Sequence, residues 1–464
     1  MNAGDTAWVL VSAALVLLMT PGLAFFYGGM TRSKGVLNMM MMSFGAIALV
    51  AVLWVLFGYS AAFGTDLGGG LLGNPFEKFG LNGVLETGEN APLVGTIPEI
   101  AFVGFQAVFA IITVALISGA IADRAKFGAW MLFAGIWVTV VYFPVAHWVF
   151  DFNEDANGNP IGGWIGQGLG AIDFAGGTAV HINAGAAALA LALVLGKRLG
   201  FGKDPSHRPH NLPFVMLGAG LLWFGWFGFN AGSALAANAT AGYAWINTLA
   251  APAAATLGWL IVEKLRDGHA TSLGAASGAV AGLVAITPAA VAITPAWSIG
   301  LGLLAGAVCA LAVGLKYKLG YDDSLDVVGV HLVGGLIGTL FIGFAANPES
   351  PAGGTGLFYG GGLELLGKQA ISSLAVMLYS FVVAFIVGWI INKTMGFRVS
   401  EEHEVTGIDV SVHTESAYEF GGRVGSAFHP LAEALRSRQT EPAPAEKPDG
   451  KPEGPGDGKI RVEA

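Results

Sequence analysis

Long apolar runs separated by short polar stretches fill the first 395 residues of the chain. A run of about 18 to 25 apolar residues is long enough to cross the hydrocarbon core of a bilayer as a helix. Eleven such runs occur, and the first lacks the basic start and cleavage site of a signal peptide. They lie near 7–29, 36–63, 99–122, 127–149, 176–196, 212–233, 243–263, 271–288, 296–317, 327–346 and 370–394. The pattern predicts an all-α polytopic membrane protein with eleven transmembrane helices.

Basic residues gather in alternate connections between these runs. One set of connections holds fourteen of them, against two, Lys78 and Lys368, in the other set. The fourteen are Arg32, Lys34, Arg124, Lys126, Lys197, Arg198, Lys203, Arg208, Lys264, Arg266, Lys316, Lys318, Lys393 and Arg398. Because basic loops stay on the cytoplasmic side, we expect the N-terminus outside and the C-terminus inside the cell membrane.

Composition agrees with a membrane protein and narrows its function. Only 12% of residues are charged, 54% are hydrophobic and the mean hydropathy is +0.63, whereas soluble domains carry about 25% charged residues. The 70 glycines suit close packing of membrane helices. The sequence contains no stripe of basic residues that would indicate a nucleic acid partner. Cys309 is the only cysteine, and neither a metal cluster, a cofactor loop nor a nucleophile–base pair is present, so we expect no cofactor, no metal and no enzyme activity.

A change of composition near residue 396 predicts two parts. Residues 1–395 form the eleven-helix domain, and 396–464 form a cytoplasmic C-terminal region. Within that region "GSAFHPLAEALRSR" predicts a short amphipathic helix, and the Pro- and Glu-rich sequence from about 440 is typical of disorder.

Two histidines stand inside apolar runs, in similar surroundings. "TAVHINAGAAAL" surrounds His181 in the fifth run, and "VGVHLVGGLIGTL" surrounds His331 in the tenth. Repeats of five helices, at about 7–196 and 212–346, would enter the membrane in opposite directions, and inverted repeats place a working site at their interface. Single histidines in membranes often serve packing, but paired ionisable groups mark a pathway or proton relay. We therefore expect His181 and His331 to line a central pore.

Residues in three further segments can be interpreted either as structural or as functional. Asp173, at the start of the fifth run, suits an N-cap and also a negative charge that makes a mouth attractive to a cation. Phe105 and Phe109 lie one helical turn apart, which fits core packing as well as an aromatic gate. "WFGWFGFNAGS", with Trp226 and Ser233, is likewise open between packing and function.

These motifs together resemble the ammonium transporter (Amt) family, bacterial type. The resemblance rests on "PGLAFFYGGMTRSKG", "GFQAVF", "DFAGGTAVHINAGAAALALALVLGKR", "GWFGFNAGSA" and "DVVGVHLVGGLIGTL", and it runs from about residue 7 to 420. It implies a homotrimer with one pore per subunit and ammonium or ammonia as substrate. It also implies a PII-type signal protein as a partner at the cytoplasmic face.

The resemblance also implies roles for single residues. Phe105, Ser233 and Asp173 would recruit ammonium, Phe105 and Phe109 would form the gate, and His181 and His331 would line the pore. Trp226 and Thr287 would be pore-neighbouring positions.

One departure from the family pattern affects the outer site. The family places a tryptophan at the mouth, but the matching position here is Phe150, which an acidic insertion follows. Either Phe150 or Trp164 takes the aromatic role. The tail beyond Arg423 extends past the usual end of the family.

The expected mechanism recruits ammonium, removes its proton and passes neutral ammonia through the apolar pore. The alternative is an ammonium sensor that signals through the C-terminal region.

Overall fold

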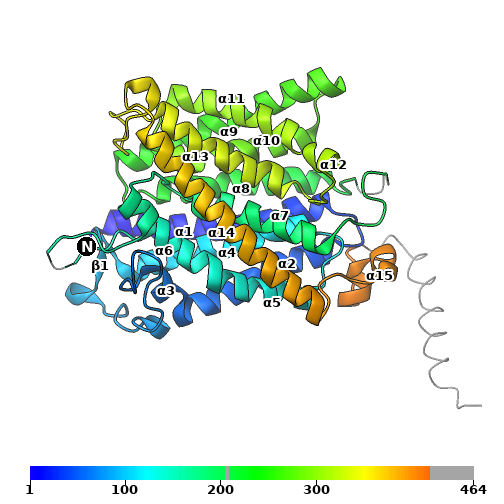
Figure 1. Ribbon diagram of the computed structural model, residues 1–464, viewed down its shortest axis with the longest axis horizontal. Helices are drawn as coiled ribbons and strands as arrows, with labels where there is room; N and C mark the ends of the chain where they lie inside the picture. Colours follow the sequence, from blue (N-terminus) through cyan, green and yellow to red (C-terminus); the bar gives the residue numbers. More distant parts are fainter. Residues whose placement is uncertain (156, 204–207, 419–464) are drawn as a thin grey trace, which may run out of the picture. The chain divides into compact units, whose positions relative to one another are not determined.

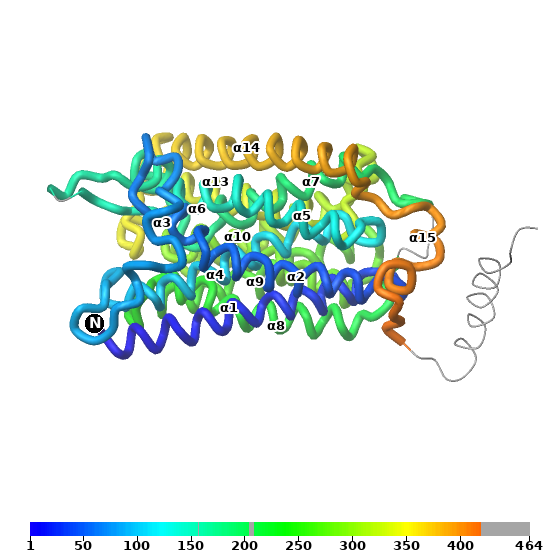
Figure 2. Tube along the Cα trace, turned by 90° about the horizontal axis from the view of Figure 1, so that it is seen from below, coloured from blue at the N-terminus to red at the C-terminus, as the bar shows by residue number. Residues whose placement is uncertain are grey.

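The computed structural model describes residues 1–155, 157–203 and 208–418. The amphipathic helix expected at 425–438, the disorder expected from 440 and the tail after Arg423 lie outside these residues. Residues Met1–Ala417 form one compact unit, a bundle of helices that run side by side (Figure 1). We call the side where α1 begins the N face and the opposite side, where α15 lies, the α15 face (Figure 2).

Eleven helical spans are long and apolar enough to cross a membrane, which confirms the predicted number. They are Ala3–Met30, Val36–Phe63, Glu99–Ile121, Phe127–Phe150, Gly177–Leu195, Leu212–Gly232, Ala239–Asp267, Ser272–Ala289, Pro295–Leu319, Val328–Ala345 and Glu364–Thr394. The last span begins six residues before its predicted start, because the polar first turn with Glu364 and Lys368 is helical although it is not apolar.

Within the spans, the α-helices are α1 (Ala3–Met30), α2 (Val36–Leu53), α3 (Tyr59–Phe63), α4 (Glu99–Ile117), α5 (Phe127–Trp137), α6 (Phe143–Phe150), α7 (Asn183–Leu195), α8 (Leu212–Gly232), α9 (Ala239–Asp267), α10 (Ser272–Ala289), α11 (Pro295–Ala312), α12 (Leu315–Leu319), α13 (Val333–Ala345) and α14 (Glu364–Thr394). A two-stranded hairpin, β1 (Leu93–Val94) and β2 (Ile97–Pro98), precedes α4.

π-helical turns occur in four of the spans: η1 (Trp54–Gly58) and η5 (Val138–Tyr142) lie inside their spans, and η7 (Gly177–Ile182) and η9 (Val328–Leu332) begin theirs. Such turns insert an extra residue into a helix and are frequent at functional sites. The turns η7 and η9 carry His181 and His331, one in each half of the chain.

The two halves meet reciprocally at these turns. The turns η7 and η9 contact each other, η7 packs on α13, and α7 packs on η9. This exchange of contacts is what a pair of inverted repeats produces.

Glycines let the helix backbones approach closely. A Cβ atom added to Gly338 of α13 would lie 2.0 Å from the carbonyl oxygen of Ala285 on α10, and one on Gly306 of α11 would lie 2.0 Å from that of Ala255 on α9. Neither contact leaves room for a methyl group. The high glycine content therefore serves helix packing at these two crossings.

The segment after α14 folds back onto the α15 face. It contains α15 (Glu401–Thr406) and the π-helical turn η11 (Asp409–His413). Val399 donates its backbone N–H to Arg124, and Asp409 accepts N–H bonds from Leu37 and Asn38 at 3.0 and 2.8 Å. The C-terminal segment is thus held by the first turn of α2 and by the loop that follows α4.

Candidate functional site

A cavity of about 470 Å³ opens at the N face. It brings together Phe105 on α4, Asp173 before η7 and Ser233 at the end of α8, three residues that the sequence assigned to one site. The other lining residues are Phe102, Gln106, Phe109, Phe150, Phe152, Gly166, Gly170, Ala171, Ile172, Phe174, Leu235, Thr240, Val291, Pro351 and Ala352. Six phenylalanines among these residues make the cavity strongly aromatic, which favours cations of low hydration.

Three phenylalanine rings close the floor of this cavity. The ring centroids of Phe105 and Phe109 are 4.9 Å apart, and those of Phe109 and Phe229 are 4.3 Å apart. None of the three side chains is more than 2% exposed. The stack lies between the cavity at the N face and the interior of the bundle, and its role as a gate stays a prediction.

Beneath the stack lies a narrow lumen with about 10 Å³ of free space. It is lined by His181, His331 and apolar residues from both halves: Met19, Leu23, Phe26, Ile112, Leu116, Val180, Leu222, Trp226, Phe229 and Val280. This volume is about the minimum that holds one water-sized molecule. Apart from Trp226, the sequence did not single out the apolar lining, because nothing distinguishes these residues from other core positions in the runs.

The two histidines contact each other inside the lumen. Their Nδ1 atoms are 3.2 Å apart and their rings stack at 5.3 Å. In a hydrogen bond between two neutral imidazoles, one Nδ1 donates and the other accepts, so one Nε2 carries a proton and the other does not. Nε2 of His181 has no hydrogen-bond partner within the described residues. The pair therefore combines a free donor and a free acceptor.

Aromatic and hydroxyl groups hold His181 in place. Its ring stacks on Trp226 at 5.4 Å and lies 6.0 Å from the ring of Phe229. Nε1 of Trp226 donates to Oγ1 of Thr287 at 2.8 Å, which joins α8 to α10. The structure thus places Trp226 and Thr287 next to the pore, where the resemblance had put them.

Asp173 caps the π-helical turn that carries His181. Its carboxylate accepts N–H bonds from Gly176, Gly177, Thr178 and Ala179 at 2.6 to 3.2 Å, and it also accepts the hydroxyl of Thr178. These bonds satisfy the exposed amides at the start of the helix. Because Asp173 also lines the outer cavity, the capping role and the charge at the mouth occur together.

Asp323 is a counterpart of Asp173 that the sequence reasoning missed. It accepts the N–H bonds of Val327 and Val328 at 3.1 and 2.7 Å and so caps η9. Burial raises its pKa to about 6, against the opposing effect of Lys316. Each aspartate precedes its histidine by eight residues. That shared spacing was the available signal.

The structure distinguishes the two aromatic alternatives at the mouth. Phe150 at the end of α6 lines the outer cavity, whereas Trp164 is not among the lining residues. The ring of Trp164 lies 5.8 Å from that of Trp148, on the other side of the last turn of α6. Phe150 therefore occupies the position that the family pattern gives to tryptophan.

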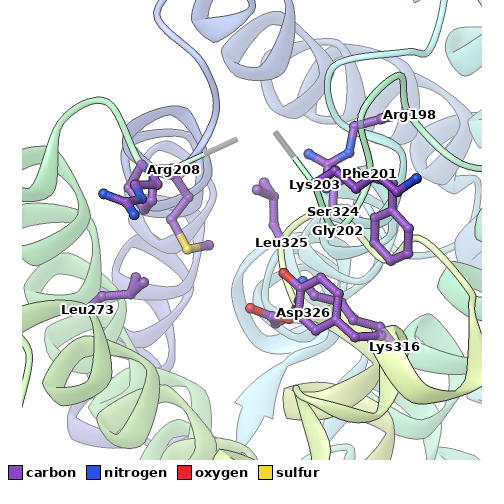
Figure 3. A pocket seen from close by; sticks show the side chains of 13 residues that line it. Arg198, Phe201, Gly202, Lys203, Arg208, Leu273, Lys316, Ser324, Leu325 and Asp326 are labelled. Carbon is purple, nitrogen blue, oxygen red and sulfur yellow. Dashed lines mark hydrogen bonds and ion pairs between the residues drawn. The ribbon is translucent and has the colours of Figure 1, made fainter. Parts of the chain in front are cut away.

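A second cavity, of about 450 Å³, lies at the α15 face, before η9 (Figure 3). Its lining includes Arg198, Lys203, Arg208 and Lys316, and Asp326 is the only carboxylate among the lining residues that the structure describes. Arg198 and Lys316 are already engaged, since Arg198 bonds Asp322 through two nitrogens at 2.9 Å and Lys316 contacts Asp326 at 2.7 Å. The two cavities thus differ in character, one aromatic and one basic.

Among the described residues, no group of three His, Cys, Asp or Glu side chains is arranged to hold a metal ion. Cys309 is buried in α11 as a free thiol.

Sequence comparison identifies the relatives of the chain. Residues 7–418 match the model of the Ammonium Transporter Family. A Mycobacterium tuberculosis protein named Ammonium transporter is 58% identical over 455 residues, which cover 94% of each chain. A Bacillus subtilis protein of the same name is 49% identical, over 90% of this chain and 99% of its own.

Solved structures agree with these relatives. The crystal structure of Candida albicans Mep2 is similar with a TM-score of 0.77 and 34% identity, over 87% of this chain and 88% of that one. A structure titled Sensor Amt Protein is similar with a TM-score of 0.78 and 28% identity, over 88% of this chain and 98% of that one.

Proposed function

The chain belongs to the ammonium transporter family, and we propose that it recruits ammonium at the N face and passes it inward as ammonia. The aromatic cavity with Phe105, Phe150 and Asp173 recruits the cation. The proton leaves there, and neutral ammonia passes the phenylalanine stack and enters the lumen beside His181 and His331.

The reason for deprotonation is the cost of moving a charge. Moving an ion from water into an apolar medium costs on the order of 20 kcal/mol in an idealised Born calculation. The lumen is narrow, and the polar groups of its lining side chains are two imidazoles and the indole N–H of Trp226. An intact ammonium ion would therefore lose most of its hydration there. Ammonia, being uncharged, avoids nearly all of that cost.

The imidazole pair supplies the lumen with hydrogen-bonding partners. Ammonia both donates and accepts, and the pair offers one donor and one acceptor. The shared Nδ1 contact also gives the released proton a route between the two rings. Potassium has a similar size and charge but no proton to lose, so the lumen excludes it.

The observation that carries the proposal is the narrow, largely apolar lumen with two imidazoles, which lies between two open cavities. Its test is solid-supported membrane electrophysiology of proteoliposomes, with ammonium compared to potassium. We expect a current with ammonium and none with potassium. Equal responses to both ions would contradict the proposal. A change of internal pH without current would show that only neutral ammonia crosses.

The placement in the membrane follows from the charges of the loops. We propose that the N face is outside and that the C-terminal segment is in the cytoplasm of the cell. The basic residues support this, since fourteen lie in the connections or the adjoining helix ends on the α15 face and two lie in those on the N face. We further propose a homotrimer, which native mass spectrometry of the purified protein tests. A PII-type partner would bind at the α15 face, and co-purification with such a protein tests that step.

The activity is proposed to be transport rather than catalysis, because the relatives at up to 58% identity are named transporters. A second candidate is an ammonium sensor, which the likeness to the structure titled Sensor Amt Protein supports at 28% identity. Deletion of residues 424–464 separates the two. Ammonium transport that persists while an ammonium-dependent signal disappears would favour the sensor.

A further inference from the structure

A third histidine, His147, is completely buried in α6 and lies outside the lumen. The transport scheme gives it no part. It sits on the last turn of α6, one turn before Phe150. A buried ionisable side chain without a role in the pore needs a separate explanation.

Both nitrogens of this imidazole face oxygen atoms. Nδ1 is 3.0 Å from the carbonyl oxygen of Ala62 and 3.4 Å from a carboxylate oxygen of Asp151, and Nε2 is 3.2 Å from a carboxylate oxygen of Asp66. The carbonyl and the ionised carboxylates only accept hydrogen bonds, and a neutral imidazole has one N–H. Satisfying both nitrogens therefore requires the doubly protonated, positively charged ring.

The charges around the ring favour that state. Burial raises the pKa of Asp151 to about 6, against the pull of His147, so this carboxylate is ionised at neutral pH. Burial also opposes ionisation of Asp66, but bonds from Gly70 and His147 outweigh it and keep the pKa of Asp66 below its usual value. The next groups outward are Lys78 and Glu99, paired at 2.6 Å, with the hydroxyl of Tyr59 donating to Glu99. Two carboxylates thus face the ring directly.

The same contacts fix the end of α6 against two loops. Asp66 accepts the N–H of Gly70, and the indole of Trp148 donates to the carbonyl of Leu71, both in the loop after α3. On the other side, the N–H of Gly163 bonds the carbonyl of Asp151, so the insertion after α6 folds back onto the same turn. The position of Phe150 is set between these two loops.

We propose that His147, charged between Asp66 and Asp151, is a positioning residue that holds Phe150 in the outer ammonium site. The inference rests on the proposed function, because Phe150 matters only if that cavity recruits ammonium. Loss of the charge on the ring loosens the loop after α3 and weakens recruitment, while the lumen and its rate of passage stay unchanged.

The variants His147→Gln and Asp66→Asn test the proposal, with His269→Gln, an exposed histidine at the α15 face, as the matched control. Gln retains a donor toward Asp66 without the charge, and Asn at 66 retains an acceptor without the charge. For both variants we expect the KM for ammonium to rise at least threefold with the maximal rate changed less than twofold. The control should match the unaltered protein throughout.

Nitrogen-15 NMR of histidine-labelled protein reads the charge without transport. At pH 7, one imidazolium signal should be present in the unaltered protein and in His269→Gln and lost in His147→Gln, and that loss assigns the signal to His147. A neutral signal for His147, or a normal KM in both variants, would overturn the inference. If His147→Gln does not fold, Asp66→Asn decides alone, since it should convert the ring to its neutral form. If ammonium caused neither a current nor a change of internal pH in the unaltered protein, the proposed function would instead be refuted, and NMR would still report the charge of the ring.

Discussion

His181 and His331 are the residues on which ammonia passage depends most directly, since they are the imidazoles of the lumen. We expect His181→Ala with His331→Ala to lower the ammonium flux about tenfold or more. Each lost hydrogen bond is worth about 1 kcal/mol, and about 1.4 kcal/mol corresponds to a factor of ten. Ammonium-evoked currents in proteoliposomes measure the effect. His269→Ala, on the surface, is the control. Undiminished flux in the double variant would exclude a role for the histidines.

Phe150 is expected to matter for recruitment and Trp164 is not. Phe150→Ala removes a cation–π face worth about 0.5–2 kcal/mol, so the KM for ammonium should rise about 2- to 30-fold. Trp164→Ala should leave KM within twofold, although the loss of its packing on Trp148 lowers stability. Concentration-dependent currents of the two variants test this. The reverse order of effects would assign the outer aromatic role to Trp164.

Sequence alone could predict the residues whose chemistry conflicts with a membrane interior. His181, His331 and Asp173 were found in this way, because polar groups at that depth need a reason. Asp323 lies in a polar connection, where an aspartate is ordinary, so only the repeated spacing distinguished it. The choice between Phe150 and Trp164 depends on how the inserted loop folds back, and no local pattern encodes that.

At the scale of elements, hydropathy predicted the existence of every span but not its internal form. The hydropathy pattern could not predict the π-helical turns η7 and η9, because a run stays apolar whether or not a turn contains one extra residue. Some helix ends also differ from their predicted positions, because side-chain caps determine where those helices begin. The first span begins at Ala3 instead of residue 7 because the side chain of Asn2 accepts the N–H of Asp5.

The connection between α12 and η9 depends on the buried ion pair of Asp322 with Arg198. Asp322→Asn should destabilise the protein by about 3 kcal/mol, as removing one partner of a buried pair usually does. Although burial opposes it, Arg198 holds the pKa of Asp322 below 3.8. A depressed pKa means that the stabilisation is complete above about pH 4 and is lost as the pH falls through the folded-state pKa.

Thermal unfolding in detergent at pH 7 and below pH 4 tests this expectation. The difference in unfolding temperature between the unaltered protein and Asp322→Asn should be smaller below pH 4 than at pH 7. Asp267→Asn breaks the exposed pair with Arg266 and should cost less than about 1 kcal/mol at either pH. A difference that is independent of pH would show that the carboxylate charge contributes nothing.

For the whole molecule, the alternation of loop charges predicts the side of each terminus. A reporter fused after residue 418 should be cytoplasmic, so green fluorescent protein should fluoresce there and alkaline phosphatase should be inactive. Fusions after Gly360, which follows the tenth span, should give the opposite result. Fluorescence and phosphatase assays in intact cells measure both. Phosphatase activity at both sites would contradict an eleven-span topology.

The number of spans and the inverted arrangement were predictable together, because an odd number of helices per half forces the second half to run upside down. The match of Asp173 with Asp323 and of His181 with His331 has a consequence for direction. A molecule that approaches from either face meets cap, turn and imidazole in the same order, apart from the phenylalanine stack on the N side. By microscopic reversibility, concentration and voltage decide which way net flow goes. Any difference in speed between influx and efflux originates in that stack and in the unlike vestibules, one aromatic and one basic.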